Sequence, residues 1–250
     1  MEITVNLWTI LLASGLTAVV TGLGALPFFF FKKFNSWWLG IFQAATAGLM
    51  LGASHNLIQE GAHLNAYRTF AGMLIGLILI VLANKLISSR GEVDLGELGG
   101  GDARKALLIL GIMTVHSFAE GIGVGVSFGG GQKLGLFITT AIAIHNIPEG
   151  LAIAMVMVPK GTKPWKAGLW AIFTSLPQPL MAVPAFLFVT LFEPWLPVGL
   201  GLAAGAMIWM VFAELIPEAY ERGPSGASIG IAVTLAFAAL LAFQEFVLVF

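Results

Sequence analysis

An imidazole and a carboxylate recur at the same spacing in two long apolar stretches of the chain. In the first stretch His116 is followed four residues later by Glu120, and in the second His145 is followed four residues later by Glu149. Residues four apart share one face of an α-helix, so each pair can present two ligand atoms in one direction. Ionisable groups at membrane depth are costly and mark a functional site by default. These four side chains are the first candidates for such a site.

Imidazole and carboxylate together suit a divalent transition metal ion. Imidazole favours Zn, Cu, Fe and Ni, and two carboxylates formally neutralise a doubly charged cation. The chain has no cysteine, which excludes disulfides and thiolate metal sites, so the ion should not be held too tightly for turnover. The alternative is that the histidines and glutamates hydrogen-bond between helices without a metal. The repetition of the pair in adjacent helices favours the metal site.

The composition indicates an integral membrane protein. Of the 250 residues, 58% are hydrophobic and 10% are charged, against about 25% charged in a soluble domain. The apolar runs are about twice the length of a barrel strand, so they predict helices. The first run lacks a basic segment before it, which predicts a retained helix rather than a signal peptide. We expect one transmembrane domain over residues 1–250, and the net charge of −1 predicts no nucleic-acid partner.

Eight transmembrane helices fit the hydrophobic pattern, each near the ~20 residues that span a bilayer. The predicted spans are Trp8–Phe31, Trp37–Gln59, Thr69–Ile87, Arg104–Phe128, Leu134–Val158, Lys166–Leu191, Val198–Glu218 and Ala227–Val249. A polar loop over about residues 88–104 separates the third span from the fourth. Pro177, Pro179 and Pro184 are expected to interrupt the sixth.

The placement of Lys and Arg predicts the orientation. Ten of the 12 basic side chains fall on one side of these spans, and only Arg68 and Lys133 fall on the other. Cytoplasmic loops carry the excess of Lys and Arg, so the richer side is cytoplasmic and the loop at about 88–104 lies there. With eight spans, both termini then lie outside. We expect a multi-pass protein of the plasma membrane or the cell inner membrane.

The second and seventh spans resemble each other. Gly48-Leu49-Met50 in one corresponds to Gly205-Ala206-Met207 in the other, and both segments continue to a Leu-Ile-x-Glu sequence. The predicted topology runs these spans in opposite directions, which indicates a 3+2+3 inverted-repeat helix bundle around the central fourth and fifth spans. Transporters place their sites at the midplane of such repeats. The alternative is convergent apolar composition.

Depth also places the paired residues centrally. His116 and His145 each lie about 12 residues into a span, or ~18 Å into a hydrocarbon core ~30 Å thick.

Toward the outer end of the second span, His55 and Glu60 are pathway candidates, as is His63. Glu214 and Glu218, one turn apart in the seventh span, are candidates for a cytoplasmic exit. The alternatives are hydrated interfacial side chains and an ordinary helix end.

The fifth-span segment from His145 to Ala152, His-Asn-Ile-Pro-Glu-Gly-Leu-Ala, closely resembles the signature of the ZIP (Zrt/Irt-like) family of metal transporters. The fourth-span segment His116–Gly121 resembles its companion motif, and the segment Glu214–Glu218 resembles the family's seventh helix. The resemblance covers essentially the whole chain. It implies eight helices, outside termini and import of divalent ions such as zinc, iron or manganese into the cytoplasm.

The resemblance also implies a ligand set that is often binuclear. One metal position would use His116, Glu120, His145 and Glu149, and a second would use Ser117, Glu120, Asn146, Glu149 and Gln178. Two of these residues depart from the family pattern. Ser117 stands where the family often has Asn, and Gln178 stands where it often has Glu. A neutral amide lacks a carboxylate's charge, so we expect one strong metal position and a second that is weak or absent.

The leading functional prediction is a transporter of divalent metal ions, zinc foremost, with Cd, Fe and Mn also allowed by the ligands. No cofactor and no enzymatic activity are expected; the partners are the metal ion and the lipid bilayer, with a homodimer left open. The main rival is an intramembrane metal-dependent hydrolase. It is disfavoured because the chain has no His-Glu-x-x-His motif and no aspartate within a span. A proton channel or other ion channel using the same carboxylates is the third alternative.

Overall fold

The computed structural model describes residues 6–31, 35–89 and 101–249 of this protein, and all regular structure in those ranges is helical. The α-helices are α1 (Leu7–Thr21), α2 (Pro27–Phe30), α3 (Ser36–Ser89), α4 (Gly101–Gly129), α5 (Gln132–Met157), α6 (Pro164–Ser175), α7 (Pro177–Leu191), α8 (Leu196–Met210), α9 (Ile216–Glu221) and α10 (Gly226–Val249). Short 3-10 turns and one π-helical segment, Val211–Leu215, join some of them. The all-α prediction is confirmed for the described ranges.

Six helical stretches among the described residues are long and apolar enough to cross a membrane. They are Leu7–Phe30, Ser36–Leu86, Gln132–Lys160, Pro164–Leu191, Leu196–Glu221 and Gly226–Gln244. These stretches support an integral membrane protein of helical type. The predicted second span falls within Ser36–Leu86, and the predicted third span, Thr69–Ile87, extends one residue beyond it. The predicted fourth span corresponds to α4, which is not one of the six. Within the predicted loop at about 88–104, residues 90–100 lie outside the described ranges.

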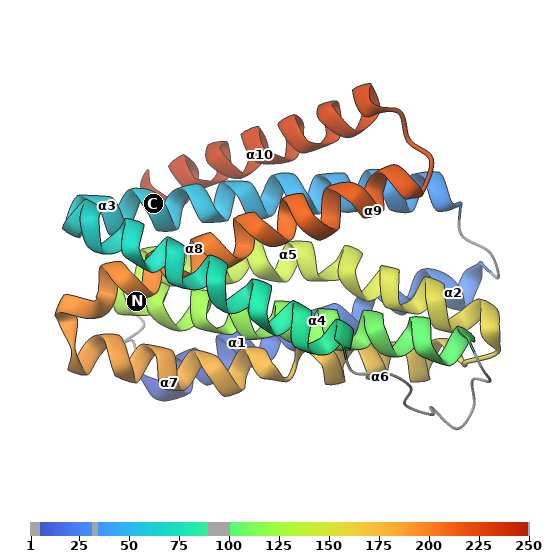
Figure 1. The fold of residues 1–250 in the computed structure, drawn as a ribbon, viewed down its shortest axis with the longest axis horizontal. Coiled ribbons are helices and arrows are strands. Elements are labelled where there is room, and N and C mark those ends of the chain that lie inside the picture. The colour runs from blue at the N-terminus through green and yellow to red at the C-terminus, as the bar shows by residue number, and fades with distance from the viewer. Residues whose placement is uncertain (1–5, 32–34, 90–100, 250) are drawn as a thin grey trace.

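The helix α3 has 54 residues, which would extend ~81 Å if it were straight, well beyond a bilayer. It is instead divided at Asn65, whose φ of −165° and ψ of 103° are extended. The Asn65 side chain accepts a hydrogen bond from the backbone N–H of Arg68 at 3.0 Å, which caps the second half of the helix. Figure 1 shows the two limbs of α3 folding back on each other. The gap predicted between Gln59 and Thr69 is therefore a capped turn at one residue rather than a loop.

The prolines of the sixth predicted span interrupt it only once. The break lies at Leu176, between α6 and α7, and Pro177 is the first residue of α7. A proline in the first helical turn removes no intrahelical hydrogen bond, which is why Pro179 is also tolerated there. Pro184 lies inside α7 without ending it. The expected interruption at Pro184 was wrong.

The helices run along one long axis of the molecule (Figure 1). The helix α10 packs beside α3, α4 packs beside α7, and α1 packs beside α5. A buried apolar core contains side chains such as Ile10, Met50, Ile138 and Met207. Large apolar side chains such as Leu12, Phe30, Leu180 and Leu235 point outward, as expected for a lipid-facing surface. The main exception to the apolar interior is a cluster of polar side chains on α1, α4, α5 and α7.

Candidate metal centre

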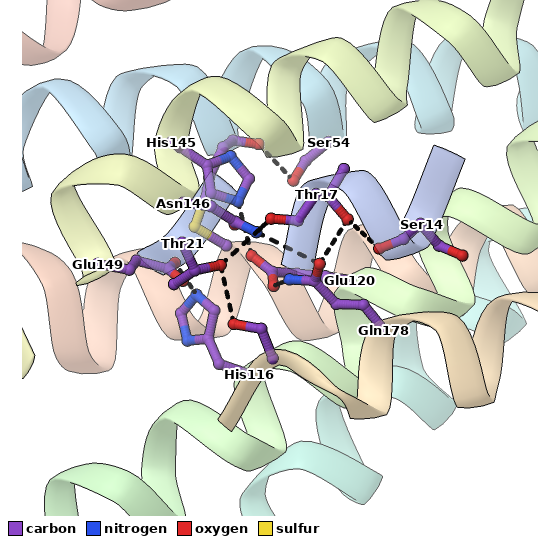
Figure 2. A network of polar contacts seen from close by, with 12 residues as sticks. Ser14, Thr17, Thr21, Ser54, His116, Glu120, His145, Asn146, Glu149 and Gln178 are labelled. Carbon is purple, nitrogen blue, oxygen red and sulfur yellow. Dashed lines mark hydrogen bonds and ion pairs between the residues drawn. The ribbon is translucent and has the colours of Figure 1, made fainter. Parts of the chain in front are cut away.

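The centre is built by α4 and α5, which are joined by a tight turn. Gly131 in that turn has a φ of 128°, a conformation that favours glycine, and it reverses the chain so that the two helices lie antiparallel. His116 and Glu120 come from α4, and His145 and Glu149 come from α5 (Figure 2). All four side chains are buried, with Glu149 the most exposed at 5%. The structure thus brings the repeated pairs together.

The pairing runs between the helices rather than along each one. Nε2 of His145 lies 2.6 Å from Oε1 of Glu120, a hydrogen-bonding distance. Nε2 of His116 lies 3.3 Å from Oε1 of Glu149. Each histidine therefore faces the carboxylate of the other helix. The spacing of four residues predicts a shared face, and the antiparallel packing of two such faces produces the crossed pairs.

Three of the side chains form a compact ligand group. His116, Glu120 and Glu149 each offer one ligand atom, and these atoms lie within 4.8 Å of one another. Zinc held by N and O atoms at about 2.0–2.2 Å sets adjacent ligands about 3.4 Å apart in a tetrahedron. Side-chain shifts of about 1 Å would close the group on an ion. His145 adjoins it through Glu120.

Several of these buried atoms have no hydrogen-bond partner among the described residues. They include both ring nitrogens of His116, Oε1 of Glu149 and Nδ1 of His145. A buried polar atom left unpaired costs about 1–3 kcal/mol. Nitrogen and oxygen atoms with free lone pairs are the ligands that a divalent transition metal needs. The donor set therefore fits a metal ion better than a purely structural network.

A second polar layer surrounds Glu120 and draws on α7 and α5. Nε2 of Gln178 donates to Oε2 of Glu120 at 2.5 Å. Nδ2 of Asn146 lies 3.3 Å from Oε1 of Gln178 and donates to the backbone carbonyl of Thr17 at 3.0 Å. Both oxygens of Glu120 are thus engaged. The amides of Gln178 and Asn146, which are predicted ligands of a second metal, form hydrogen bonds to protein groups.

Sequence reasoning missed the contribution of α1. The hydroxyl of Thr17 lies 2.6 Å from Oε1 of Gln178, and the hydroxyl of Ser175 donates to that of Thr21 at 2.9 Å. Ser14, Thr17 and Thr21 form a stripe at spacings of three and four in an otherwise apolar helix. That periodicity marks one buried face and could have identified it. Figure 2 shows this face of α1 turned toward the centre.

A third carboxylate approaches from the π-helical segment. Oε2 of Glu214 lies 3.6 Å from Nδ1 of His116, too far for a hydrogen bond. Nδ2 of Asn84, on the second limb of α3, donates to Oε1 of Glu214 at 2.5 Å. π-Helical turns are rare in proteins, and those that occur often lie at functional sites. Glu214 therefore lies beside the centre, and Asn84, which the sequence did not single out, holds it there.

The remaining candidates are more scattered. Ser117 is buried at 1% exposure beside His116. His55 is exposed, and its ring packs edge-on against Phe237 of α10 with the centroids 6.2 Å apart. Glu218 forms an ion pair with Arg222 at 2.8 Å, one turn away. The structure does not bring His55 or Glu218 into the central ligand group.

Glu60 lines a cavity of about 330 Å³ at the end of the bundle where α4 meets α5. The cavity walls are Asn56, Gln59, Glu60, His63, Gly130, Gly131, Lys133, Leu134, Phe137 and Gln244. Asn56, Glu60 and His63 follow one another at spacings of four and three, so they share one face of α3. Oδ1 of Asn56 is buried and has no hydrogen-bond partner in the described part of the chain. Polar oxygens and an imidazole thus face this cavity.

Two glycines set how closely the helices approach at the centre. A Cβ at Gly150 of α5 would overlap the backbone carbonyl of Thr21 on α1. A Cβ at Gly121 of α4 would lie 2.5 Å from the backbone oxygen of Gln178 on α7. Such contacts require glycine, because the obstacle is backbone that cannot rotate away. They bring α1 and α7 near enough for Thr17 and Gln178 to reach α5 and α4.

Comparison with known proteins assigns these features to one family. The family described as ZIP zinc transporter matches residues 88–243, which include the whole α4–α5 centre. The chain is 46% identical over 239 residues to a putative zinc transporter of Arabidopsis thaliana, covering 94% of this chain and 38% of that protein. It is 33% identical over 229 residues to zinc transporter GufA of Myxococcus xanthus, covering 85% of this chain and 89% of GufA.

A third relative is zinc transporter ZIP11 of Homo sapiens, 33% identical over 144 residues, which cover 55% of this chain and 42% of that protein. The chain thus spans less than half of the Arabidopsis and human relatives but most of GufA. The family match covers more than half of the chain and includes both His-x-x-x-Glu pairs. This protein therefore belongs to the ZIP zinc transporter family.

Proposed function

We propose that this protein moves divalent transition-metal ions, zinc foremost, across a membrane into the cytoplasm. The observation that carries the proposal is the buried group of His116, Glu120 and Glu149 inside a bundle of membrane-length helices. His145 completes the ligand set through its contact with Glu120. Two carboxylates offset the charge of a 2+ ion, which makes its presence at membrane depth affordable.

The ligands suit an ion that must also leave. The set contains nitrogen and oxygen and no thiolate, because the chain has no cysteine. Glu120 is already bonded at both oxygens, to His145 and to Gln178. An incoming ion exchanges these bonds rather than adding to them, which lowers its net gain in free energy. A transported ion needs such moderate affinity, and a structural metal does not.

Polar groups on either side of the centre suggest the route of the ion through the bundle. The cavity walled by Glu60 and His63 is the proposed outer entrance. Glu214, which lies 3.6 Å from His116, is the proposed first group on the exit side, and Glu218 follows one turn later. His55, exposed beside Phe237, is the weakest of the pathway candidates.

The proposed topology has eight spans, an inverted 3+2+3 repeat and both termini outside. The two limbs of α3, divided at Asn65, support counting it as two spans, and the 29 residues of α4 are enough for another. The turn at Gly131 lies on the side with few basic residues, so it is the outer side. The proposed location is the plasma membrane or the cell inner membrane.

Zinc is the proposed main cargo because the relatives carry the name zinc transporter. Cadmium, iron and manganese suit the same ligands. Members of this family are transporters rather than enzymes. The hydrolase alternative therefore has no support from the comparisons.

Zinc uptake into proteoliposomes with a trapped fluorescent indicator tests the proposal. We expect saturable uptake by the unmodified chain and its near-complete loss in Glu149→Ala. The matched control is Glu221→Ala, which removes an exposed carboxylate at the end of α9, outside the centre, and should transport normally. Equal uptake by the chain and Glu149→Ala would refute the central site, and the absence of any uptake with zinc still bound would refute transport.

A further inference from the structure

The amide of Gln178 decides how many metal ions the centre holds, because its two ends behave oppositely. The carbonyl oxygen can bind a cation, whereas the NH₂ group only donates hydrogen bonds. One of these ends faces Oε2 of Glu120 at 2.5 Å, and the side chain is fully buried. The direction of this amide can be derived from its neighbours.

The backbone carbonyl of Thr17 only accepts hydrogen bonds, so the Asn146 atom at 3.0 Å must be Nδ2. The same Nδ2 lies 3.3 Å from one end of the Gln178 amide, which must then be Oε1. Nε2 is left to face the carboxylate of Glu120, itself only an acceptor when ionised. Each step is consistent with the next.

The reversed amide would be unfavourable at both ends. It would set the NH₂ of Gln178 against the NH₂ of Asn146, and its carbonyl oxygen against the carboxylate of Glu120. The hydroxyl of Thr17 lies 2.6 Å from Oε1 of Gln178, but its single proton is shared with the carbonyl of Ser14 at 2.7 Å. Asn146 is therefore the stronger of the two orienting groups.

Gln178 also cannot retreat from the centre. The backbone of α7 at this residue lies so close to α4 that a Cβ at Gly121 would come within 2.5 Å of its carbonyl oxygen. The amide is thus held against Glu120 by the packing of two helices and turned toward it by Asn146.

We propose that Gln178 and Asn146 are not metal ligands, and that the N–H of Gln178 takes the place of a second cation beside Glu120. Asn146 acts as a positioning residue, which fixes the direction of the Gln178 amide from the backbone of α1. The centre then holds one ion, bound by His116, Glu120, His145 and Glu149. This inference rests on the proposed function, because it concerns the stoichiometry of the transported ion.

The test counts zinc ions per chain by inductively coupled plasma mass spectrometry. The detergent-purified protein is first saturated with zinc and then washed free of unbound zinc. We expect one ion in the unmodified chain and two in Gln178→Glu, where a carboxylate of equal size replaces the donor. Asn146→Ala removes the NH₂ that fixes the amide and adds no ligand, so Gln178 can turn its oxygen toward Glu120, and we again expect two ions. Adding Gln178→Leu to Asn146→Ala should restore one.

Two ions in the unmodified chain, or one in Gln178→Glu, would overturn the inference while leaving transport intact. Two ions in the double variant would also overturn it, because the second position would then not depend on the Gln178 amide. Failure of the proposed function looks different: no bound zinc and no uptake by the unmodified chain. Gel filtration shows whether each variant folds, and the isosteric Gln178→Glu carries the test if Asn146→Ala does not.

Discussion

Replacing Gly150 with alanine probes whether the close packing of α1 on α5 maintains the centre. The added Cβ would overlap the backbone carbonyl of Thr21, so α1 must move away from α5. Thr17 lies one turn before Thr21 on α1, and its carbonyl accepts the hydrogen bond of Asn146. The substitution should therefore weaken both the fold and the polar layer around Glu120.

The size of the effect follows from two opposed contributions. Overpacking a buried site costs about 1–3 kcal/mol, and a fixed backbone obstacle places this substitution near 3. Alanine in place of glycine within a helix returns about 1 kcal/mol. The net loss is then about 2 kcal/mol, which lowers the melting temperature of a domain this size by about 4–8 °C. Loss of an orienting partner costs about 10–100-fold in metal affinity.

Gly123→Ala is the matched control, because a Cβ there would lie 3.7 Å from Cβ of Ala203, an ordinary contact. We expect this variant to melt about 2–4 °C higher than the unmodified chain, from the helix propensity alone. Melting is followed by the fluorescence of the seven tryptophans in detergent, and affinity by the zinc dependence of uptake. If Gly150→Ala melts as high as Gly123→Ala, or binds zinc normally, the argument from packing is wrong.

Three further experiments test the route of the ion and its ligands. Asn84→Leu leaves Glu214 without its hydrogen bond at 2.5 Å. The maximal uptake rate should fall about tenfold, as it does when other orienting partners of metal ligands are lost. An unchanged rate would remove Glu214 from the path. Glu60→Gln removes one charge from the outer cavity, and that charge is worth about 1 kcal/mol. The zinc concentration for half-maximal uptake should therefore rise about fivefold, with the maximal rate unchanged. A lowered maximal rate alone would contradict an entrance role. His116→Ala should weaken zinc binding in equilibrium dialysis more than His145→Ala does, and equal losses would refute unequal roles for the two histidines.

The fold was predictable where apolar residues dominate a long stretch of the sequence. Apolar runs of bilayer length indicated the membrane helices, and the boundaries of the fifth span shifted by only two residues at its start and one at its end. Prediction failed where a local bond decided the outcome. The capped turn at Asn65 depends on one side-chain acceptor, and α7 continues through Pro184 although proline inside a helix removes a backbone hydrogen bond.

The centre was predictable in membership but not in connectivity. The two His-x-x-x-Glu pairs identified the four side chains that meet between α4 and α5. Which carboxylate each histidine faces depends on the relative rotation of two helices, which no spacing within one helix specifies. The roles of Gln178 and Asn146 depend on the direction of an amide, which is set by a backbone carbonyl of α1. Backbone groups have no sequence signature, so the direction of this amide could not be predicted from the sequence.

The two halves of the centre differ in what they can gain from an ion. On one side, Glu120 is bonded at both oxygens and His145 shares one of those bonds, so a metal ion there replaces interactions that already exist. On the other side, Nε2 of His116 and Oε1 of Glu149 lie 3.3 Å apart, and Nδ1 of His116 lies 3.6 Å from Glu214, without forming hydrogen bonds within the described ranges. Each unpaired buried atom costs about 1–3 kcal/mol, which a bound ion relieves. More of the binding free energy therefore comes from His116 and Glu149, and removing His116 should cost more affinity than removing His145.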